Sequence, residues 1–156
     1  MNTCLKRGED WVKIVLLGLK QATPLAKDDG VEKQRMTGEM AFTIRRAANG
    51  DEIAACASLY ERVTAAAFPW RPAGYHSAAE FHGFVAQEEV WIAEQAGDVL
   101  GLLLFYRPGN YIHALYVDPG AQGRGIGRAL VETVAATAAG FVALKVSEPA
   151  AGARAF

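Results

Sequence analysis

The chain of 156 residues has few cysteines, almost no net charge and no long apolar run. Its two cysteines, Cys4 and Cys56, fit neither a metal-binding spacing nor a disulfide framework. The net charge of −1 argues against a general binder of polyanions such as nucleic acid. No apolar run reaches the roughly 20 residues that a membrane-spanning helix needs. These absences predict a cytoplasmic protein without a metal, nucleic-acid or membrane partner, and the length predicts one main domain.

The most informative stretch of the sequence joins a predicted strand to a predicted helix. Residues 111–117 are apolar, β-branched or aromatic, which is typical of a strand, and from Leu130 the apolar residues recur at helical spacing. Between them, Gly123, Gly125 and Gly127 allow a tight turn and let a ligand reach the backbone amides. The first amides of a helix lack internal partners and carry partial positive charge, so the turn predicts a phosphate or pyrophosphate site.

Two widespread phosphate-binding motifs do not match this turn. A Walker A loop requires Gly-Lys-Ser/Thr, and no lysine follows these glycines. A dinucleotide fingerprint counted from Gly123 requires glycine where the sequence has Arg128. What remains is a Gln/Arg-x-x-Gly-x-Gly/Ala pattern after a Val-Asp-Pro bend, and it reads Gln122-Gly123-Arg124-Gly125-Ile126-Gly127.

This pattern, with the strand before it and the helix start after it, resembles motif A of the GNAT superfamily of N-acetyltransferases. The resemblance covers residues 42–146 and implies an α+β fold with a mixed, mostly antiparallel sheet and helices on both faces. It implies acetyl-CoA as co-substrate and no metal, with backbone groups of Leu115, Tyr116 and Val117 paired to the pantetheine arm. The pyrophosphate would be held by the loop residues Gln122, Gly123, Arg124, Gly125, Ile126, Gly127 and Arg128.

The residues around this motif predict the order strand, helix, helix, three strands, helix, strand. Asn49 or Asp51 can cap the first helix, and Ser77 with Glu80 forms a capping box at the second. Gly101 indicates a bulge or close packing. The last strand follows a helical crossover, so it should run parallel to the strand before it. The predicted strands are residues 42–46, 90–94, 99–106, 111–117 and 141–146, and the first two helices are residues 52–66 and 77–87.

An irregular loop at residues 68–76 contains two prolines among several aromatic residues. In the family that the sequence resembles, the corresponding connection between the first two helices lines the acceptor side of the cleft. Trp70, Tyr75 and His76 are therefore candidate substrate-binding residues. The alternative interpretation is that these rings only pack against the end of the domain.

Acetyl transfer to an amine requires a base for the amine and a proton for the departing thiolate. His113 is the best-placed candidate base, because histidine titrates near neutral pH and strand alternation puts it on the face of Leu115 and Val117. The alternative is a partly buried structural histidine. His76 in the loop and His82 on a predicted helix are weaker candidates.

Both ends of the sequence depart from the resemblance. Apolar spacing at residues 11–19 predicts a helix, and residues 27–39 read as a charged linker. Residues 1–39 are expected to be an extension ahead of a start at Met36 or Met40, or else a functional leader. The family's general acid is a tyrosine on a fourth helix, and that tyrosine and the last two strands are missing from a sequence that ends at Phe156.

The predicted domains are thus an extension at residues 1–39 and a GNAT domain at residues 40–156 that is incomplete at its C-terminus. Without the last two strands, residues 141–146 would form an uncovered, apolar sheet edge. We expect a homodimer through this strand, strand exchange or low solubility, unless residues 11–19 fold back onto the exposed face.

The predicted function is transfer of the acetyl group of acetyl-CoA to a primary amine of a small molecule or a protein, by direct attack in a ternary complex. The alternative is a truncated, non-catalytic CoA-binding remnant of such an enzyme. A plain interaction module is a weaker hypothesis, because it leaves the glycine turn unexplained.

Overall fold

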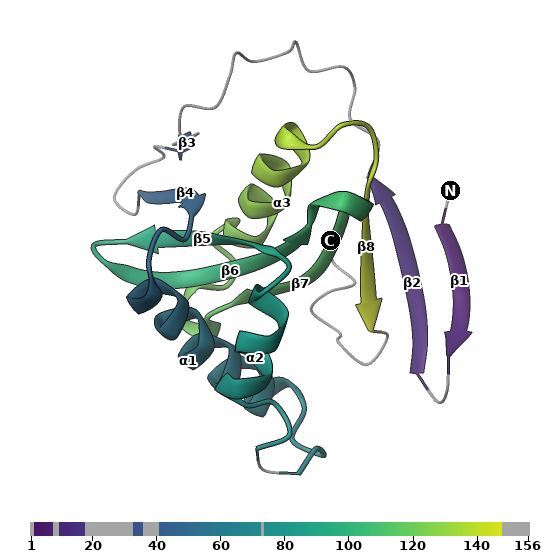
Figure 1. The fold of residues 1–156 in the computed structure, drawn as a ribbon, viewed down its shortest axis with the longest axis horizontal. Coiled ribbons are helices and arrows are strands. Elements are labelled where there is room, and N and C mark those ends of the chain that lie inside the picture. The colour runs from purple at the N-terminus through teal and green to yellow at the C-terminus, as the bar shows by residue number, and fades with distance from the viewer. Residues whose placement is uncertain (1, 8–9, 18–32, 36–40, 73, 148–156) are drawn as a thin grey trace.

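The computed structural model describes residues 2–7, 10–17, 33–35, 41–72 and 74–147. They form one eight-stranded sheet in the order β1-β2-β8-β7-β6-β5-β4-β3. Helices α1 and α2 cover one face of the sheet and α3 covers the other (Figure 1). The sheet is antiparallel except where β8 runs parallel to β7. This is the mixed, mostly antiparallel α+β fold that the resemblance implies.

The elements from residue 42 onward follow the predicted order. The helical crossover through α3 makes β8 parallel to β7, as expected. Short 3-10 turns at Arg107–Gly109 and Pro119–Ala121 flank β7 on either side. The bounds are β4 Phe42–Arg46, α1 Gly50–Ala67, α2 Ala78–Val85, β5 Glu89–Gln95, β6 Asp98–Tyr106, β7 Tyr111–Val117, α3 Ile126–Thr137 and β8 Val142–Ser147.

Local residue chemistry explains where several of these elements begin. The Asn49 side chain accepts a hydrogen bond from the Glu52 amide, at 3.0 Å, so Asn49 rather than Asp51 caps α1. Ser77 accepts from the Glu80 amide at 3.2 Å at the start of α2. The β5–β6 hairpin turns at Ala96 and Gly97, which both have positive φ, the geometry that suits the right-handed twist of the two strands.

Each face of the sheet has its own apolar core because side chains of each strand alternate between the two faces. The core under α3 combines helix residues such as Leu130 and Val134 with sheet residues such as Leu103. The core under α1 and α2 includes Phe81 and the fully buried Cys56. Burial raises the pKa of the Cys56 thiol to about 12.

Gly101 lies at a β-bulge and is also closely packed, so both predictions for this glycine are confirmed. The β5–β6 register shifts there, with Ala93 opposite Gly101 and Glu94 opposite Val99, so β6 carries a bulge. A Cβ on Gly101 would lie 3.0 Å from Ile126 Cγ2 and 3.2 Å from the Tyr116 carbonyl oxygen. Only glycine therefore lets the first turn of α3 approach the sheet this closely.

The N-terminal residues differ from the prediction. Residues 11–17 form a strand rather than a helix, within an antiparallel hairpin of β1 (Asn2–Arg7) and β2 (Asp10–Leu17). Their apolar spacing suits a helix, but Val12, Ile14 and Val15 are β-branched and favour a strand where an edge is available for pairing. Inside the predicted linker, β3 (Lys33–Arg35) pairs with β4. Residues 18–32 and 36–40 lie outside the described residues.

The expectation of an uncovered edge at residues 141–146 is wrong. All of β8 pairs antiparallel with β2, from Val12 opposite Ser147 to Leu17 opposite Val142. The N-terminal segment does fold back, as the alternative proposed, but it adds strands to the sheet instead of laying a helix on its face (Figure 1). A dimer through this edge would require β2 to leave it. The C-terminal residues 148–156 lie outside the described residues.

Candidate functional site

The site begins where β7 and β8 separate. These parallel strands pair only at Tyr111 with Ala143 and at Ile112 with Leu144. On its other side β7 stays paired with β6 as far as Val117. Residues 114–117 of β7 therefore keep their β6 partners while β8 diverges from them (Figure 1). This leaves a backbone edge in the middle of the sheet that an extended ligand could pair with.

The three strand residues predicted to contact the coenzyme use their side chains for packing. Leu115 and Val117 pack against the core under α3, and Tyr116 packs against the core under α1 and α2. The ring of Tyr116 lies 5.3 Å from that of Tyr60 in an edge-to-face arrangement. Burial, with a smaller contribution from the Glu80 carboxylate, raises the pKa of Tyr116 to about 12. These half-buried side chains thus pack into the two cores, and the backbone is the part of these residues that an extended ligand could pair with.

The turn after β7 is tied to its surroundings through Asp118. Its amide donates to the Leu100 carbonyl at 2.9 Å, beside the β6 bulge. Its carboxylate accepts from the Gly120 amide at 2.9 Å and from Arg62 of α1 at 3.1 Å, and both contacts lower the pKa of Asp118. Gln122 Nε2 closes the turn by donating to the Val117 carbonyl at 3.3 Å. The turn is therefore fixed on both faces of the sheet.

The N-terminus of α3 presents backbone amides at a glycine-rich turn, the candidate anion cradle. Gly123 and Gly125 have φ of 78° and 77°, and a Cβ on either would meet no atom within 4 Å. Gly125 occupies the N-cap position without a side-chain cap, and the first helical bond runs from the Ala129 amide to the Gly125 carbonyl at 2.9 Å. The preceding amides of residues 126–128 have no intrahelical acceptor, so the space above them suits a phosphate.

The side chains of this loop add little of their own to the cradle. Ile126 is buried against Gly101, and Gly127 is buried as well, so both offer only their backbone. Arg124 donates to Gln95 Oε1 at 2.8 Å, and Arg128 pairs with Glu132 at 2.8 Å while 75% of its side chain stays exposed. The structure therefore brings the predicted loop residues together around one helix end, with Arg128 as the solvent-exposed cation.

His113 lies on the opposite face from the one predicted for it. In the β6–β7 pairing Leu104 faces Ala114 and Phe105 faces Ile112, so His113 is the extra residue of a β-bulge. The bulge breaks the alternation that the sequence argument assumed. Ile112 joins the core under α3, and the His113 ring packs 5.2 Å from Phe84 on the α2 side.

A carboxylate that the sequence did not single out holds this histidine. His113 Nδ1 lies 2.5 Å from Glu88 Oε1, between the end of α2 and the start of β5. The Glu88 side chain is 8% exposed and that of His113 is 46% exposed. Glu88 belongs to no motif and is 25 residues away along the chain. Only the bulge and the fold bring the two together, so no signal in the sequence indicates the pair.

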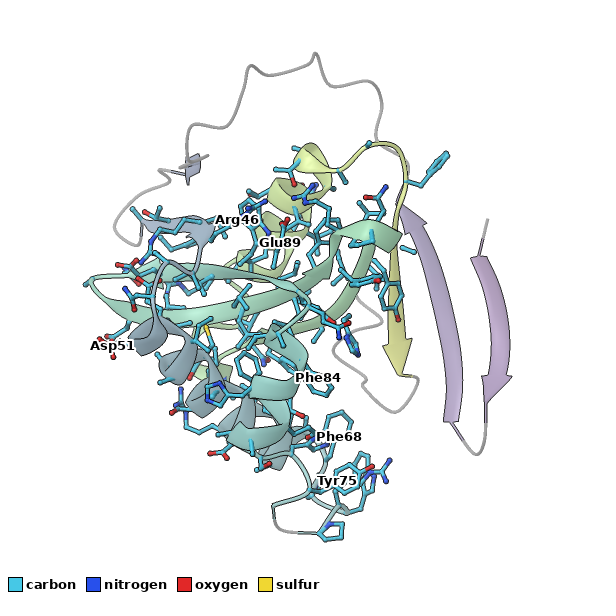
Figure 2. All side chains as sticks on the ribbon, viewed as in Figure 1. Arg46, Asp51, Phe68, Tyr75, Phe84 and Glu89 are labelled. Atoms are coloured by element: carbon cyan, nitrogen blue, oxygen red, sulfur yellow. The ribbon has the colours of Figure 1, made fainter. Side chains whose placement is uncertain are left out.

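The acceptor-loop candidates separate into one half-buried, hydrogen-bonded histidine and two exposed rings. His76 Nδ1 lies 2.9 Å from the Tyr60 hydroxyl, which donates to Glu80 at 2.8 Å. Burial, with Glu80 adding to it, raises the pKa of Tyr60. Trp70 and Tyr75 are 60% and 49% exposed. In Figure 2, Tyr75 lies beyond Phe68 at the end of the helical layer remote from the β4–α1 turn.

Two classes of site have no support among the residues that the structure describes. No group of three or more His, Cys, Asp and Glu side chains in this part of the chain could hold a metal ion. Of the described helices, none combines the length and the apolar character that crossing a membrane requires.

Comparison with known proteins points to one family. The family model described as acetyltransferase (GNAT) family matches residues 56–156. The apo form of YjaB from Escherichia coli is 26% identical with a TM-score of 0.62, over 75% of this chain and 79% of that one. The aminoglycoside acetyltransferase meta-AAC0020 from an uncultured soil metagenomic sample, in complex with sisomicin, shares the fold at 22% identity with a TM-score of 0.55, over 74% and 84%. Curated protein sequences gave no significant match.

Proposed function

Because the chain belongs to the GNAT family of N-acetyltransferases, we propose that it transfers the acetyl group of acetyl-CoA to a primary amine by direct attack in a ternary complex. The observation that carries the proposal is the uncapped N-terminus of α3 beside the unpaired edge of β7. One feature suits a pyrophosphate and the other suits an extended amide-bearing chain. Acetyl-CoA contains both groups in one molecule.

In this proposal acetyl-CoA is bound mainly by backbone groups. The amides of residues 126–128 would hold the pyrophosphate, and Arg128 would add a cation at the solvent side. The edge of Leu115, Tyr116 and Val117 would pair with the pantetheine amides, which leaves the thioester near the bulge in β7. Gly123 and Gly125 fit this role because both have a positive φ that other residues rarely adopt, and no side chain covers the backbone there.

The chemical step needs a group that removes one proton from the amine. The amine nitrogen attacks the thioester carbonyl, the C–N bond forms, the C–S bond breaks, and the proton lost by nitrogen balances the proton gained by the CoA thiolate. His113 Nε2 would accept the amine proton, since Nδ1 is engaged by Glu88 and nearly half of the side chain is exposed.

The acceptor, a small molecule or a protein with a free amine, would enter beside α1 and α2. His76 is anchored there to Tyr60, whose ring contacts Tyr116 of β7. Trp70 and Tyr75 at the outer end of the loop would contact parts of the acceptor remote from its amine. His76 supports this placement, because its partner Tyr60 belongs to the same core as Phe84, against which the His113 ring packs.

The proposal is tested by acetyl transfer to a panel of primary amines: polyamines, aminoglycosides, amino acids and peptides with a free N-terminus. Thiol release measures turnover and mass spectrometry identifies the acetylated product. His113→Ala should lower kcat/KM by about 10²- to 10⁴-fold, the usual contribution of a general base, without weakening acetyl-CoA binding. His82→Ala, at an exposed helical histidine, is the matched control and should stay near wild type.

Two results would contradict the proposal. An unchanged rate for His113→Ala would show that another group takes the proton. Tight acetyl-CoA binding without transfer to any amine in the panel would favour the alternative, a CoA-binding protein without catalysis.

A further inference from the structure

The contact between His113 and Glu88 joins an exposed ring to a buried carboxylate. An ion pair between two exposed side chains contributes little to stability because solvent screens it, but this pair is asymmetric. The Glu88 side chain is 8% exposed against 46% for His113. Its second oxygen, Oε2, is fully buried and has no hydrogen-bond partner within the part of the chain that the structure describes. A buried carboxyl oxygen without a hydrogen-bond partner is costly to the fold, so its retention calls for a role.

The surroundings of His113 restrict its ring to a narrow range of orientations. The bulge in β7 directs the side chain to the α2 face. Phe84 lies 5.2 Å from the ring on one side and Tyr111 lies 6.2 Å away along the same strand. With Nδ1 bonded to Glu88, the opposite edge of the imidazole carries Nε2, which has no hydrogen bond to another described residue.

An ionised carboxylate accepts hydrogen bonds and cannot donate one. A neutral histidine beside it therefore keeps its proton on Nδ1, and Nε2 is left as the basic nitrogen. The carboxylate also favours the imidazolium that forms once Nε2 has taken a proton. Glu88 thus has the chemistry to set both the tautomer and the direction of the ring.

We propose that Glu88 is a positioning residue that holds His113 with its proton on Nδ1 and its Nε2 turned toward the acceptor amine. The effect on catalysis rests on the proposed function, in which His113 is the base. The effect on the tautomer is a property of the folded chain and does not depend on it.

The test combines a double-mutant cycle with a spectroscopic measurement on the full chain. The variants are Glu88→Gln, His113→Ala and the two together, with Asp51→Asn as a matched control at an exposed carboxylate of α1 (Figure 2). Gln is nearly isosteric with Glu but can donate as well as accept, so it no longer enforces one tautomer. Imidazole ¹⁵N shifts report the tautomer, and steady-state kinetics separate kcat from the KM for acetyl-CoA.

We expect Glu88→Gln to lower kcat at least about tenfold with little change in the KM for acetyl-CoA, as for other carboxylates that orient a catalytic histidine. In the His113→Ala background it should change kcat less than about twofold, because its effect passes through the ring. The ¹⁵N shifts should move from the Nδ1–H pattern toward a mixture of tautomers. Asp51→Asn should leave all three measurements unchanged.

Unchanged ¹⁵N shifts in Glu88→Gln would overturn the proposal, as would an equal loss of kcat with and without His113. If His113→Ala alone keeps the wild-type rate, the base assignment fails, and the ¹⁵N shifts still decide the role of Glu88. Thermal unfolding of each variant identifies any loss that comes from misfolding, and Glu88→Gln should not lower the melting temperature because the substitution is nearly isosteric.

Discussion

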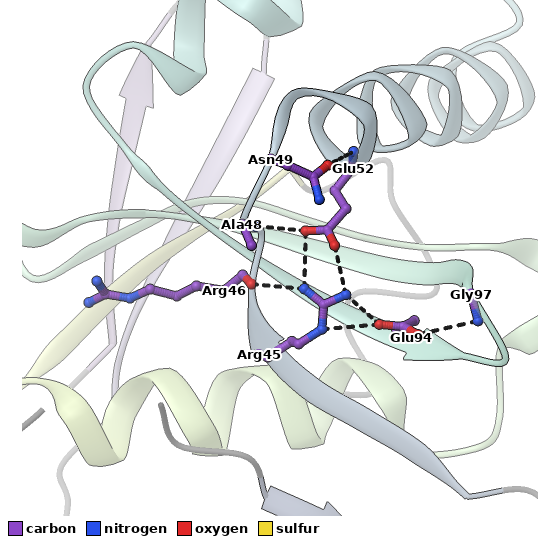
Figure 3. Close-up of polar contacts among 7 residues, drawn as sticks. All are labelled: Arg45, Arg46, Ala48, Asn49, Glu52, Glu94 and Gly97. Carbon is purple, nitrogen blue, oxygen red and sulfur yellow. Dashed lines mark hydrogen bonds and ion pairs between the residues drawn. The ribbon is translucent and has the colours of Figure 1, made fainter. Parts of the chain in front are cut away.

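At the scale of single residues, Arg45 joins three elements through two carboxylates (Figure 3). Its guanidinium, on β4, donates to Glu52 of α1 at 2.8 Å and 3.0 Å and to Glu94 of β5 at 3.0 Å. Glu52 also accepts from the Ala48 amide at 2.6 Å. The cluster fixes the turn between β4 and α1 against the neighbouring strand, at the end of α1 opposite the acceptor loop.

This cluster predicts a pH-dependent contribution to stability. The hydrogen bond from Arg45 and then that from the Ala48 amide lower the pKa of Glu52 from 4.5 to about 2. Because the pKa is lower in the folded state, the stabilisation is fully present above pH 4.5 and is lost as the pH falls toward 2. Glu52→Gln should lower the free energy of unfolding by about 1 kcal/mol at pH 7, and the difference should vanish in acid. Urea unfolding across this pH range measures it.

Asp51→Asn is the control for that series, since Asp51 is the adjacent carboxylate of the same helical turn and lies outside the cluster. Its difference from wild type should stay small and nearly constant with pH. A Glu52→Gln difference that is independent of pH would show that the Arg45 contact contributes nothing measurable.

Residue-level prediction succeeded where the determinant is local. The caps at Asn49 and Ser77 depend on a side chain and an amide three residues away, and the uncapped start of α3 depends on the nearby Gly123 and Gly125. The Glu88–His113 contact depends on a bulge and on the packing of α2 against β7, so neither residue carries a local signal for the other.

At the scale of elements, the position of α3 depends on a missing side chain in the strand below it. Gly101 lies under Ile126 and Leu130, which a Cβ would approach to 3.0 Å and 3.4 Å. The same added Cβ would lie 3.2 Å from the Tyr116 carbonyl oxygen of β7. The helix end that would hold the pyrophosphate and the strand that would pair with pantetheine thus meet at one glycine.

Gly101→Ala should therefore affect both stability and ligand binding. Displacing α3 should lower the free energy of unfolding by about 1–3 kcal/mol, and acetyl-CoA affinity should fall because the cradle moves relative to β7. Gly83→Ala is the matched control: its Cβ would meet nothing within 4 Å and its helix gains about 1 kcal/mol or less. Thermal melts and titrations of both variants measure the contrast. Equal behaviour would contradict the role of Gly101.

Element-level prediction was sound from residue 42 to residue 147 and failed before it. The strands and helices of that range carry clear periodicity and turn chemistry, and the structure reproduces their order. Residues 11–17 show helical spacing, yet they form β2 because the edge of β8 provides partners for their backbone. The face of His113 was also wrong, because a one-residue bulge inverts the alternation on β7.

At the scale of the whole molecule, the N-terminal hairpin completes the sheet. β8 has six paired positions with β2 and two with β7. The strand that diverges from β7 beside the proposed coenzyme site is therefore held mainly from its other side. The hairpin would thus support the wall of that site, which gives the predicted fold-back of the N-terminal segment a structural role.

Deleting residues 1–39 should destabilise the chain and expose the edge of β8. We expect the melting temperature to fall by at least about 5 °C and the truncated chain to associate through the free edge. Deleting residues 1–9 removes β1 and leaves β2 on β8, so it should have a much smaller effect. Light scattering after size-exclusion chromatography measures association. A monomeric truncated chain with an unchanged melting temperature would contradict this role.

The central claim is that the N-terminus of α3 binds the pyrophosphate of acetyl-CoA, and calorimetric titration tests it most directly. The variant Gly125→Glu places a carboxylate in the cradle, whereas Gly140→Glu introduces the same charge at another left-handed glycine, beyond the far end of α3. We predict a Kd on the order of micromolar for wild type and Gly140→Glu, and loss of binding in folded Gly125→Glu. Equal affinity of Gly125→Glu and wild type, or no binding by folded wild type, would contradict the account.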